Sequence, residues 1–265
     1  MRKTIGLALG GGGVRGLAHV GVIKTFLKHN IPIDYIAGCS IGAWVGAHYA
    51  LRKNINSLES YTVNKKKEKL LSFWDLSFSG GIIKGEKVRA LLDDWLGQDE
   101  FKDLKIPFQA VATDLVTGLP VVLNDGRLSQ AVYASMAIPW VFKPVVMKKQ
   151  ILVDGAVCNP VPDDLVKAMG ADIVVAVNLD NFQQSGLFKM KDLSFASTGL
   201  RSFDITRHYL AKYSMKSSDI IISPPLARYD SWKDYFMKDV GKKIMKIGEV
   251  EAEKIIPQLK EMMGE

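Results

Sequence analysis

A serine with glycines around it stands between two apolar segments of the chain. The pattern is G-x-S-x-G over residues 38–42, with Ser40 at its centre, and it follows the short apolar run 35–38. Between a strand and a helix, this pattern is typical of a nucleophile elbow, a sharp turn that exposes the serine hydroxyl. Gly38 and Gly42 remove side chains that would clash in such a turn. The alternative is an ordinary helix start at which the serine is only the N-cap.

A second glycine-rich stretch, G-G-G-V-R-G over residues 11–16, follows the apolar segment 4–9. Glycines let the backbone turn sharply and approach a ligand closely, and the N-terminus of a following helix favours an anion or a developing oxyanion. The same pattern is typical of a dinucleotide site, which needs an acidic residue about 20 positions further on to hold a ribose. Asp34 has that spacing but precedes the second expected strand, at the wrong end.

An aspartate at the end of a buried segment is a candidate general base. Asp154 is followed by Gly155 and comes directly after the apolar residues 151–153. Side chains at the carboxyl ends of strands project into the cleft where α/β sheets carry their sites. The alternative is a turn aspartate, since Asp-Gly is common in turns.

A histidine is the usual partner of a catalytic serine. His208 follows both Ser40 and Asp154 in chain order, so a Ser-Asp-His triad is an alternative. However, it lies in a stretch with a helical pattern and no loop signal, which favours a surface or hydrogen-bonded histidine. Cys39 is also of a nucleophilic type, but it flanks the elbow position and is interpreted as a small buried residue.

The elements that must position these residues follow an alternating pattern of apolar, partly β-branched segments and helical segments. This pattern predicts an α/β fold, a three-layer α/β/α arrangement with a mostly parallel central sheet. The expected strands are 4–9, 35–38, 108–113, 119–123, 151–153, 172–179 and 220–222. The expected helices are 17–29, 41–51, 129–136, 195–215 and 238–263. We expect a single domain over residues 1–265.

The order of the three motifs resembles the patatin-like phospholipase family. The matching segments are 11–16, 38–42, 134–139, 142–145, 154–156 and 159–162. The resemblance covers about residues 4–180, and we expect residues 181–265 to pack on the same domain. It implies the patatin-like fold and a serine acyl hydrolase that cleaves phospholipid or other carboxylic esters through an acyl-serine intermediate. A catalytically inactive member that serves as an adaptor or regulator is the alternative without turnover.

The family uses a Ser-Asp dyad without a catalytic histidine. Carried over by motif, Ser40 is the nucleophile and Asp154 the base, and partial burial would raise the pKa of this carboxyl. The resemblance implies oxyanion N–H groups from Gly11, Gly12, Gly13 and Ile41. The supporting motif residues are Arg15, Gly16, Gly38, Gly42 and Gly155. We expect Arg15 to brace the loop, with contact to an anionic headgroup as the alternative. The mechanism requires no metal and no organic cofactor.

The composition limits the class of protein. The chain has 265 residues, a formal net charge of +7, 48% hydrophobic residues and 24% charged residues. These values exclude a disordered or collagen-like chain. No apolar run reaches the roughly 18 residues of a membrane-spanning helix. The stretch 4–9 is interpreted as a first strand and not as an export signal, and Cys39 and Cys158 are expected to be free thiols, so we expect a cytoplasmic protein.

The partners that we expect are a lipid or ester substrate and no nucleic acid. The segment 65–78 places four lysines before bulky apolar residues, among them Phe73 and Trp74. This composition suits peripheral contact with an anionic membrane, although the lysines are equally compatible with a solvated helix face and the apolar residues with the core. Trp140 and Phe142 are candidates to line an acyl channel, with the core as the alternative.

Overall fold

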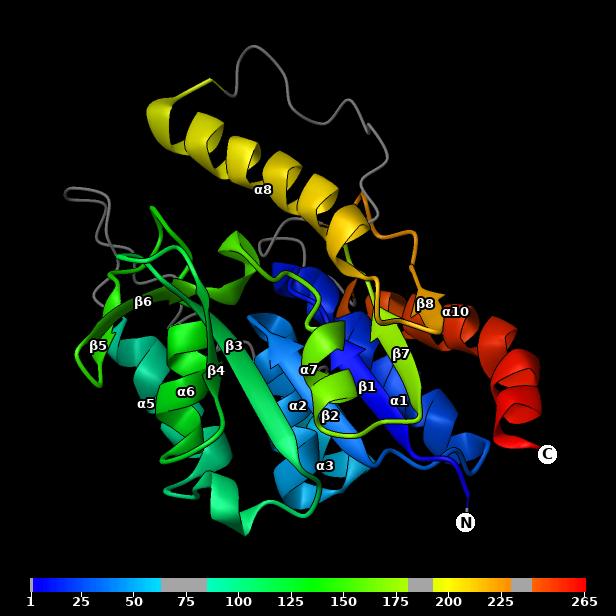
Figure 1. Cartoon of the computed structure of the whole chain (residues 1–265). Coiled ribbons are helices and arrows are strands. Elements are labelled where there is room, and N and C mark those ends of the chain that lie inside the picture. The colour runs from blue at the N-terminus through cyan, green and yellow to red at the C-terminus, as the bar shows by residue number, and fades with distance from the viewer. Residues whose placement is uncertain (1, 63–84, 181–192, 230–239) are drawn as a thin grey trace.

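The computed structural model describes residues 2–62, 85–180, 193–229 and 240–265 (Figure 1). The described strands are β1 (Ile5–Leu9), β2 (Tyr35–Cys39), β3 (Phe108–Asp114), β4 (Pro120–Leu123), β5 (Val145–Met147), β6 (Gln150–Asp154), β7 (Ile173–Val177) and β8 (Ile220–Ile222). The described α-helices are α1 (Leu17–Lys28), α2 (Ile41–Arg52), α3 (Ile55–Thr62), α5 (Glu86–Leu96), α6 (Leu128–Ser135), α7 (Asp163–Ala168), α8 (Phe195–Ser214) and α10 (Val240–Met263). The strands form one eight-stranded sheet.

The sheet has a parallel half and an antiparallel half. Its order is β5-β6-β3-β2-β1-β7-β8, with β4 also paired to β3. Five strands are parallel to one another, in the order β3, β2, β1, β7 and β8. The strands β4 and β6 run antiparallel to β3, and β5 runs antiparallel to β6. The predicted α/β architecture is therefore confirmed, and the parallel half is the part that carries the first two motifs.

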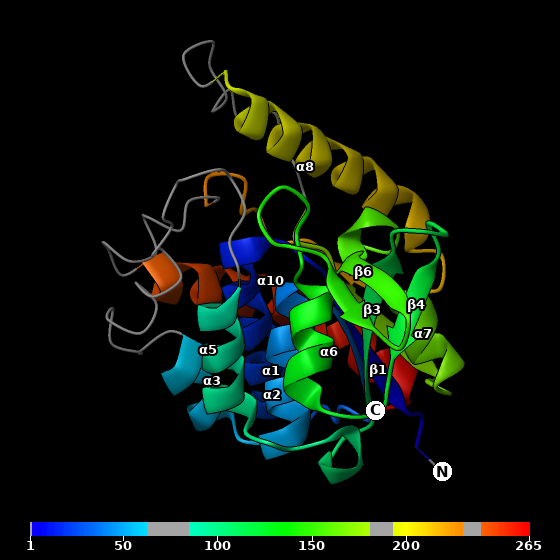
Figure 2. The ribbon, with the colours of Figure 1, turned by 90° about the vertical axis from the view of Figure 1, so that its left-hand side faces the viewer.

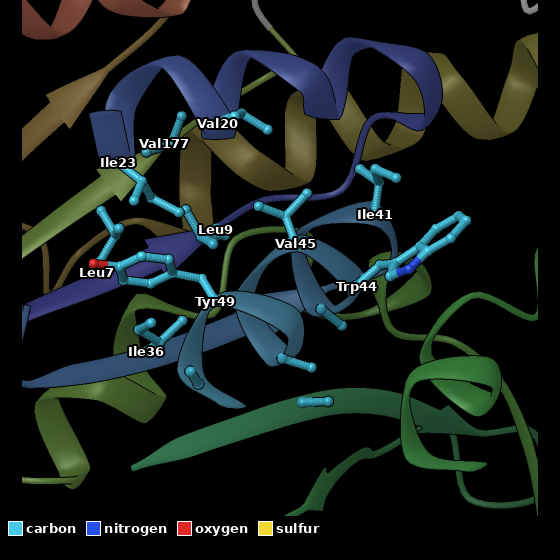
Figure 3. Packing of buried hydrophobic residues seen from close by; sticks show 14 of the residues in the cluster. Leu7, Leu9, Val20, Ile23, Ile36, Ile41, Trp44, Val45, Tyr49 and Val177 are labelled. Carbon is cyan, nitrogen blue, oxygen red and sulfur yellow. The ribbon is translucent and has the colours of Figure 1, made fainter. Parts of the chain in front are cut away.

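Alternation along the buried strands divides the core into two layers. Leu7 and Leu9 of β1 point into the larger apolar cluster, while Ala8 between them belongs to the cluster on the opposite face. The larger cluster is filled from α1, α2, α3, α5, α6 and α10. Figure 3 shows Val20 of α1 and Tyr49 of α2 among the side chains of this cluster.

The smaller layer lies under α7 and the C-terminal part of α8. Its members are mostly small, such as Ala8, Val174 and Ala211. Gly6 allows α7 to pack closely on β1, because a Cβ at this position would lie 2.8 Å from the Cβ of Val166 in α7. Both faces of the sheet are thus covered by helices, which confirms the predicted three layers.

The chain beyond residue 192 adds to the same sheet. β8 pairs with β7, and α10 packs on α1 through small residues. A Cβ at Gly21 would lie 2.1 Å from the carbonyl oxygen of Met245, and one at Gly248 would lie 2.2 Å from that of Ala18. α8 crosses the end of the sheet at which β1, β2 and β7 end (Figures 1 and 2). That end is where the candidate functional residues gather.

Candidate active site

Ser40 occupies a strained turn between β2 and α2. Its backbone has φ 53° and ψ −121°, in a region that serine rarely adopts and that costs about 1–3 kcal/mol. The turn excludes side chains on both sides: a Cβ at Gly42 would lie 2.1 Å from the Leu9 carbonyl oxygen, and one at Gly38 would lie 2.5 Å from that of Gly42. The Ser40 side chain caps no helix N–H. The N-cap alternative is therefore wrong, and the geometry is that of an elbow.

The Ser40 hydroxyl donates directly to a carboxylate. Its Oγ lies 2.6 Å from Oδ2 of Asp154 at the end of β6. Both residues are buried, with 5% of Ser40 and 1% of Asp154 exposed. The other carboxylate oxygen, Oδ1, accepts the N–H of Ala156 at 2.9 Å. The structure thus brings together the two residues that were predicted as nucleophile and base, and the carboxylate is held at both oxygens.

Asp154 reaches this position on an antiparallel strand. The sequence predicted that Asp154 ends a strand, which is confirmed, but it gave no direction for that strand. β6 runs against β3 and pairs Asp154 with Ala112. The preceding residue of β3, Val111, pairs with Cys39 at the end of β2. Asp154 therefore arrives beside Ser40 from the opposite direction, because β3 continues past the end of β2 and pairs with β6 from Ala112 to Asp114.

Burial changes the acidity of the base. Desolvation raises the pKa of Asp154 from 3.8 to about 6, although hydrogen bonds from Ser40 and Ala156 and the charge of Arg207 act in the opposite direction. Above about pH 6 the carboxylate is ionised and can accept the serine proton. A carboxylate with a pKa near neutrality is a stronger base than an exposed aspartate, and this suits general base catalysis.

The glycine-rich loop lies directly against the dyad. A Cβ at Gly11 would lie 3.5 Å from the Cβ atoms of both Ser40 and Ala156. The Gly11 N–H donates to the carbonyl oxygen of Pro160 at 2.9 Å, so it is engaged within the fold. This corrects the expectation that Gly11 donates to an oxyanion, because its hydrogen bond instead anchors the loop to the segment after β6.

Three other predicted donors have their N–H groups available. Within the described residues, the backbone N–H groups of Gly12, Gly13 and Ile41 donate to no other protein atom. Gly13 begins a short 3₁₀ turn that leads into α1, and Ile41 begins α2. Such first-turn N–H groups have no partner within their own helix, which leaves them free to hold an anion.

Comparison with known proteins agrees with this geometry. The family model of the patatin-like phospholipase matches residues 7–166, a stretch that contains Ser40, Asp154 and the glycine-rich loop. The chain belongs to the patatin-like phospholipase family. This finding confirms the resemblance that the motifs had indicated.

The patatin-like chain has relatives in bacteria and animals. An uncharacterised NTE family protein of Mycobacterium tuberculosis is 36% identical over 177 residues, which cover 66% of this chain and 49% of that protein. Neuropathy target esterase sws of Drosophila melanogaster is 30% identical over 196 residues, which cover 72% of this chain and 14% of that protein. This chain therefore matches half or less of the length of these relatives.

A solved structure supports the fold. The crystal structure of VipD from Legionella pneumophila superimposes with a TM-score of 0.64 at 13% identity, covering 97% of this chain and 67% of that chain. At this identity the likeness concerns the fold alone. The coverage of this chain includes the part after residue 180, where the sequence carried no motif.

Sequence reasoning missed a buried ion cluster near Ser40 and Asp154 of this patatin-like chain. Asp180 follows β7 and accepts two hydrogen bonds from Arg207 of α8, at 2.7 and 2.8 Å. Arg15 reaches the same carboxylate at 3.4 Å and donates from Nε to the Gly12 carbonyl oxygen at 3.2 Å. Arg15 thus braces the glycine-rich loop and links it to α8. The sequence signal for this cluster was Asp180, an aspartate that follows a buried strand. Arg207 lies in a helical pattern and gave no such signal.

The histidine alternative is not supported by the positions of its members. His208 is buried in α8, and its Nδ1 contacts the carbonyl oxygen of Asp180. The Ser40 hydroxyl donates to Asp154 with no histidine between them. The other buried histidine of the neighbourhood, His19, contacts the Gly10 carbonyl oxygen at 2.8 Å, and burial lowers its pKa to about 4. It is therefore neutral and holds the backbone before the glycine-rich loop.

Two further alternatives are settled by contacts. Cys39 is fully buried with Sγ 3.8 Å from Oδ1 of Asp154, and burial together with this carboxylate raises its thiol pKa well above the usual value. The thiol stays protonated, which disfavours it as the nucleophile. Asp34, the candidate ribose ligand, precedes β2 and pairs with Arg2 at 2.5 Å. It lies at the opposite end of β2 from Ser40.

The remaining predicted lipid contacts have different outcomes. Phe142 belongs to the core, where its ring meets that of Tyr133 edge-on at 6.4 Å between centroids. Trp140 is half exposed and lies under α8, since a Cβ at Gly199 would be 3.5 Å from its ring. The segment 65–78 is the candidate for contact with a membrane. All of it lies outside the described residues.

Three further features of the described ranges concern a bilayer, a metal ion and a cavity. No helix there is both long and apolar enough to cross a bilayer. Across the same ranges, no group of three or more His, Cys, Asp or Glu side chains is arranged to hold a metal ion. A cavity of about 250 Å³ is lined by residues of α5, α6 and β5 and by Arg127. Its lining includes neither Ser40, Asp154 nor the glycine-rich loop.

Proposed function

We propose that this chain is a serine acyl hydrolase that cleaves carboxylic esters of phospholipids, lysophospholipids or related lipids. The observation that carries the proposal is the 2.6 Å hydrogen bond from Ser40 Oγ to the buried carboxylate of Asp154. Family membership supports a lipid ester as the substrate, and the fly relative is named an esterase. The strained elbow supports the role of Ser40, because strain of this kind gathers at active sites.

The acylation step uses the two members of the dyad in turn. Asp154 takes the proton of Ser40 while Oγ forms a bond to the carbonyl carbon of the ester. The resulting tetrahedral intermediate collapses, the bond to the leaving alkoxide breaks, and Asp154 returns the proton to that alkoxide oxygen. The products of this step are an acyl-serine and a free alcohol.

Deacylation repeats the sequence with water. The Asp154 carboxylate takes a proton from a water molecule, whose oxygen attacks the acyl carbon. The bond between the acyl carbon and Oγ then breaks, and the proton passes to Ser40. A carboxylate with a pKa of about 6 is suited to both directions of transfer near neutral pH.

The developing negative charge on the carbonyl oxygen is assigned to backbone donors. Gly12, Gly13 and Ile41 have N–H groups that no other described protein atom uses, whereas the Gly11 N–H is engaged by Pro160. A preorganised donor of this type is worth about 3 kcal/mol of barrier lowering. Arg15 contributes by fixing the Gly12 carbonyl and with it the direction of the neighbouring N–H groups.

The decisive experiment combines labelling and turnover. The wild type should react with a fluorophosphonate probe, in which the serine oxygen bonds to phosphorus and fluoride leaves. It should also hydrolyse a soluble p-nitrophenyl ester. Ser40→Ala should lose both, and Asp154→Asn should lose most turnover. His208→Gln, which retains a hydrogen-bonding side chain, should keep its turnover. Loss of turnover in His208→Gln as well as in Ser40→Ala would favour the triad, while a folded wild type without labelling or turnover would favour an inactive adaptor.

We also infer that the substrate is met at an anionic membrane surface, from the composition of the segment 65–78 and the net charge of +7. Attraction of lysines to headgroups is screened within about 10 Å at 0.1 M salt. The protein should co-sediment with vesicles that contain phosphatidylserine more than with phosphatidylcholine vesicles, and salt should weaken this. The variant replaces the lysines together by glutamine: Lys65, Lys66, Lys67 and Lys69. It should bind vesicles less while its hydrolysis of a soluble ester stays unchanged, and equal losses in both would contradict the inference.

A further inference from the structure

The end of α6 and the turn that follows it contact both members of the dyad. Ser135 is the last residue of α6 and is fully buried. Its Oγ accepts the backbone N–H of Ser40 at 2.9 Å. Two residues later, the carbonyl oxygen of Ala137 accepts the backbone N–H of Asp154 at 2.9 Å. One short segment of chain thus holds the backbone of the nucleophile and the backbone of the base.

The Ser135 hydroxyl stands in an interrupted sheet ladder. At the start of β2, the N–H of Ile36 donates to the carbonyl oxygen of Pro107 at 3.0 Å. In a parallel pair such bonds recur at every second residue, so the N–H of Gly38 would meet the carbonyl oxygen of Gln109 and the N–H of Ser40 that of Val111. The observed register, in which Cys39 is paired with Val111, agrees with this.

The direct bond is replaced because the chain turns away at the elbow. Ser40, with φ 53°, follows Cys39, the last residue of β2, and begins the turn into α2. The Ser135 hydroxyl fills the gap: it accepts from Ser40 and donates to the Val111 carbonyl oxygen at 2.7 Å. Both buried backbone groups therefore keep a hydrogen-bond partner while the strained turn forms.

We infer that Ser135 is a positioning residue for the dyad, whose hydroxyl replaces the missing ladder bond and holds Ser40 Oγ within reach of Asp154. The inference rests on the proposed function, in which Ser40 is the nucleophile. It also assigns a role to the motif 134–139, which the dyad and the oxyanion donors leave unused. Because the Ser40 N–H is occupied by Ser135, it is not available to an oxyanion, whereas the Ile41 N–H donates to no described protein atom.

The test compares Ser135→Ala with a matched control in the same helix. Ser129 is also a buried serine of α6, it touches neither Ser40 nor Asp154, and Ser129→Ala should leave turnover unchanged. Ser135→Ala should lower kcat for a soluble ester about 10- to 100-fold, the size expected for a misplaced reacting group, with KM little changed. Ser135→Thr, which keeps the hydroxyl, should recover much of the loss.

Two readouts separate positioning from general damage. The hydrogen bond from Ser40 lowers the Asp154 pKa, so loosening it in Ser135→Ala should move the acidic limb of the kcat/KM profile to higher pH. Amide hydrogen exchange at the elbow peptide, measured by mass spectrometry, should become faster in Ser135→Ala and not in the Ser129 control. The exchange measurement does not depend on turnover.

The outcomes distinguish this inference from the proposed function. A wild type that neither reacts with fluorophosphonate nor hydrolyses esters would remove the proposed function, whatever Ser135 does. An active wild type with a folded Ser135→Ala variant of unchanged kcat, acidic limb and elbow exchange would overturn the inference alone. Should Ser135→Thr lose as much as Ser135→Ala while folded, the hydroxyl would not be the group that positions Ser40.

Discussion

Replacing Asp154 by asparagine should abolish hydrolysis and at the same time make the folded protein more stable above pH 6. Burial raises the pKa of this carboxyl to about 6, which means that the folded state resists its ionisation. Asparagine has nearly the same shape and no charge. Its oxygen can still accept from Ala156, and its amide group can donate to the Ser40 oxygen.

The magnitude follows from linkage between the pKa and folding. A carboxyl with a folded pKa above its unfolded value stabilises the fold fully below the unfolded pKa and loses this contribution as the pH rises. The two values are 3.8 and about 6, so the loss occurs between about pH 4 and pH 6. At 1.36 kcal/mol for each pKa unit, the ionised carboxylate lowers the free energy of unfolding by about 3 kcal/mol at pH 7. Roughly half of this appears between pH 5 and pH 8.

The assay is urea unfolding of wild type and Asp154→Asn at pH 5 and pH 8, analysed as the change between the two pH values. Comparing changes cancels any packing difference that asparagine introduces at both pH values. Between pH 5 and pH 8, the free energy of unfolding of the wild type should fall by about 1–1.5 kcal/mol more than that of the variant. In parallel, the variant should show less than 1% of wild-type ester turnover, since the loss of a general base is worth about 10²–10⁴-fold.

Equal pH dependence in the two proteins would refute the reasoning. It would mean that the Asp154 carboxyl ionises as easily in the folded chain as in the unfolded chain, so that burial does not tune this base. A wild type that gains stability relative to the variant as the pH rises would show that hydrogen bonds outweigh burial at this site.

Three further predictions concern the neighbours of the dyad and the absence of a cofactor from the mechanism. Arg207→Gln should move the acidic limb of kcat/KM to higher pH, because the positive charge of Arg207 lowers the Asp154 pKa; an unmoved limb in a folded variant would contradict this. Gly42→Ala should lower Tm and abolish turnover, because its Cβ would lie 2.1 Å from the Leu9 carbonyl oxygen and overpacking costs about 1–3 kcal/mol; a fully active, equally stable variant would show that the elbow can relax. Ester hydrolysis should survive exhaustive EDTA treatment, since serine and aspartate supply both nucleophile and base; activity that disappears and returns with zinc or calcium would oppose the dyad mechanism.

The chemistry at each motif could be predicted from the sequence because it depends on neighbouring residues. Glycines at 38 and 42 predict a turn that has no room for side chains. In the structure, a Cβ added at either position would lie too close to backbone atoms. Apolar, partly β-branched runs and helical patterns likewise predicted most of the longer elements, including β7 and α8. The short β5 and α7, of three and six residues, gave too few positions for a pattern to be recognised.

The position of Asp154 at the end of a strand was predicted correctly, but the direction of that strand was not predicted. The sequence placed Asp154 at the end of a strand but could not give the direction in which that strand runs. Strand direction depends on which strand pairs with which, and β6 pairs antiparallel with β3. Only this pairing brings a carboxylate to a serine that is 114 residues away in the chain.

The tertiary structure alone decided which groups surround the dyad. It engaged the Gly11 N–H with Pro160, placed the Ser135 hydroxyl between Ser40 and Val111, and buried Asp180 beneath Arg207. None of these contacts leaves a local signal, because each joins segments that are far apart in the chain and depends on the final register and packing. The sequence by itself determined a nucleophile elbow and a glycine-rich loop, since glycine conformational freedom is a local property. The hydrogen-bond partners and the acidity of the base are properties of burial, which exists only once the whole chain has folded.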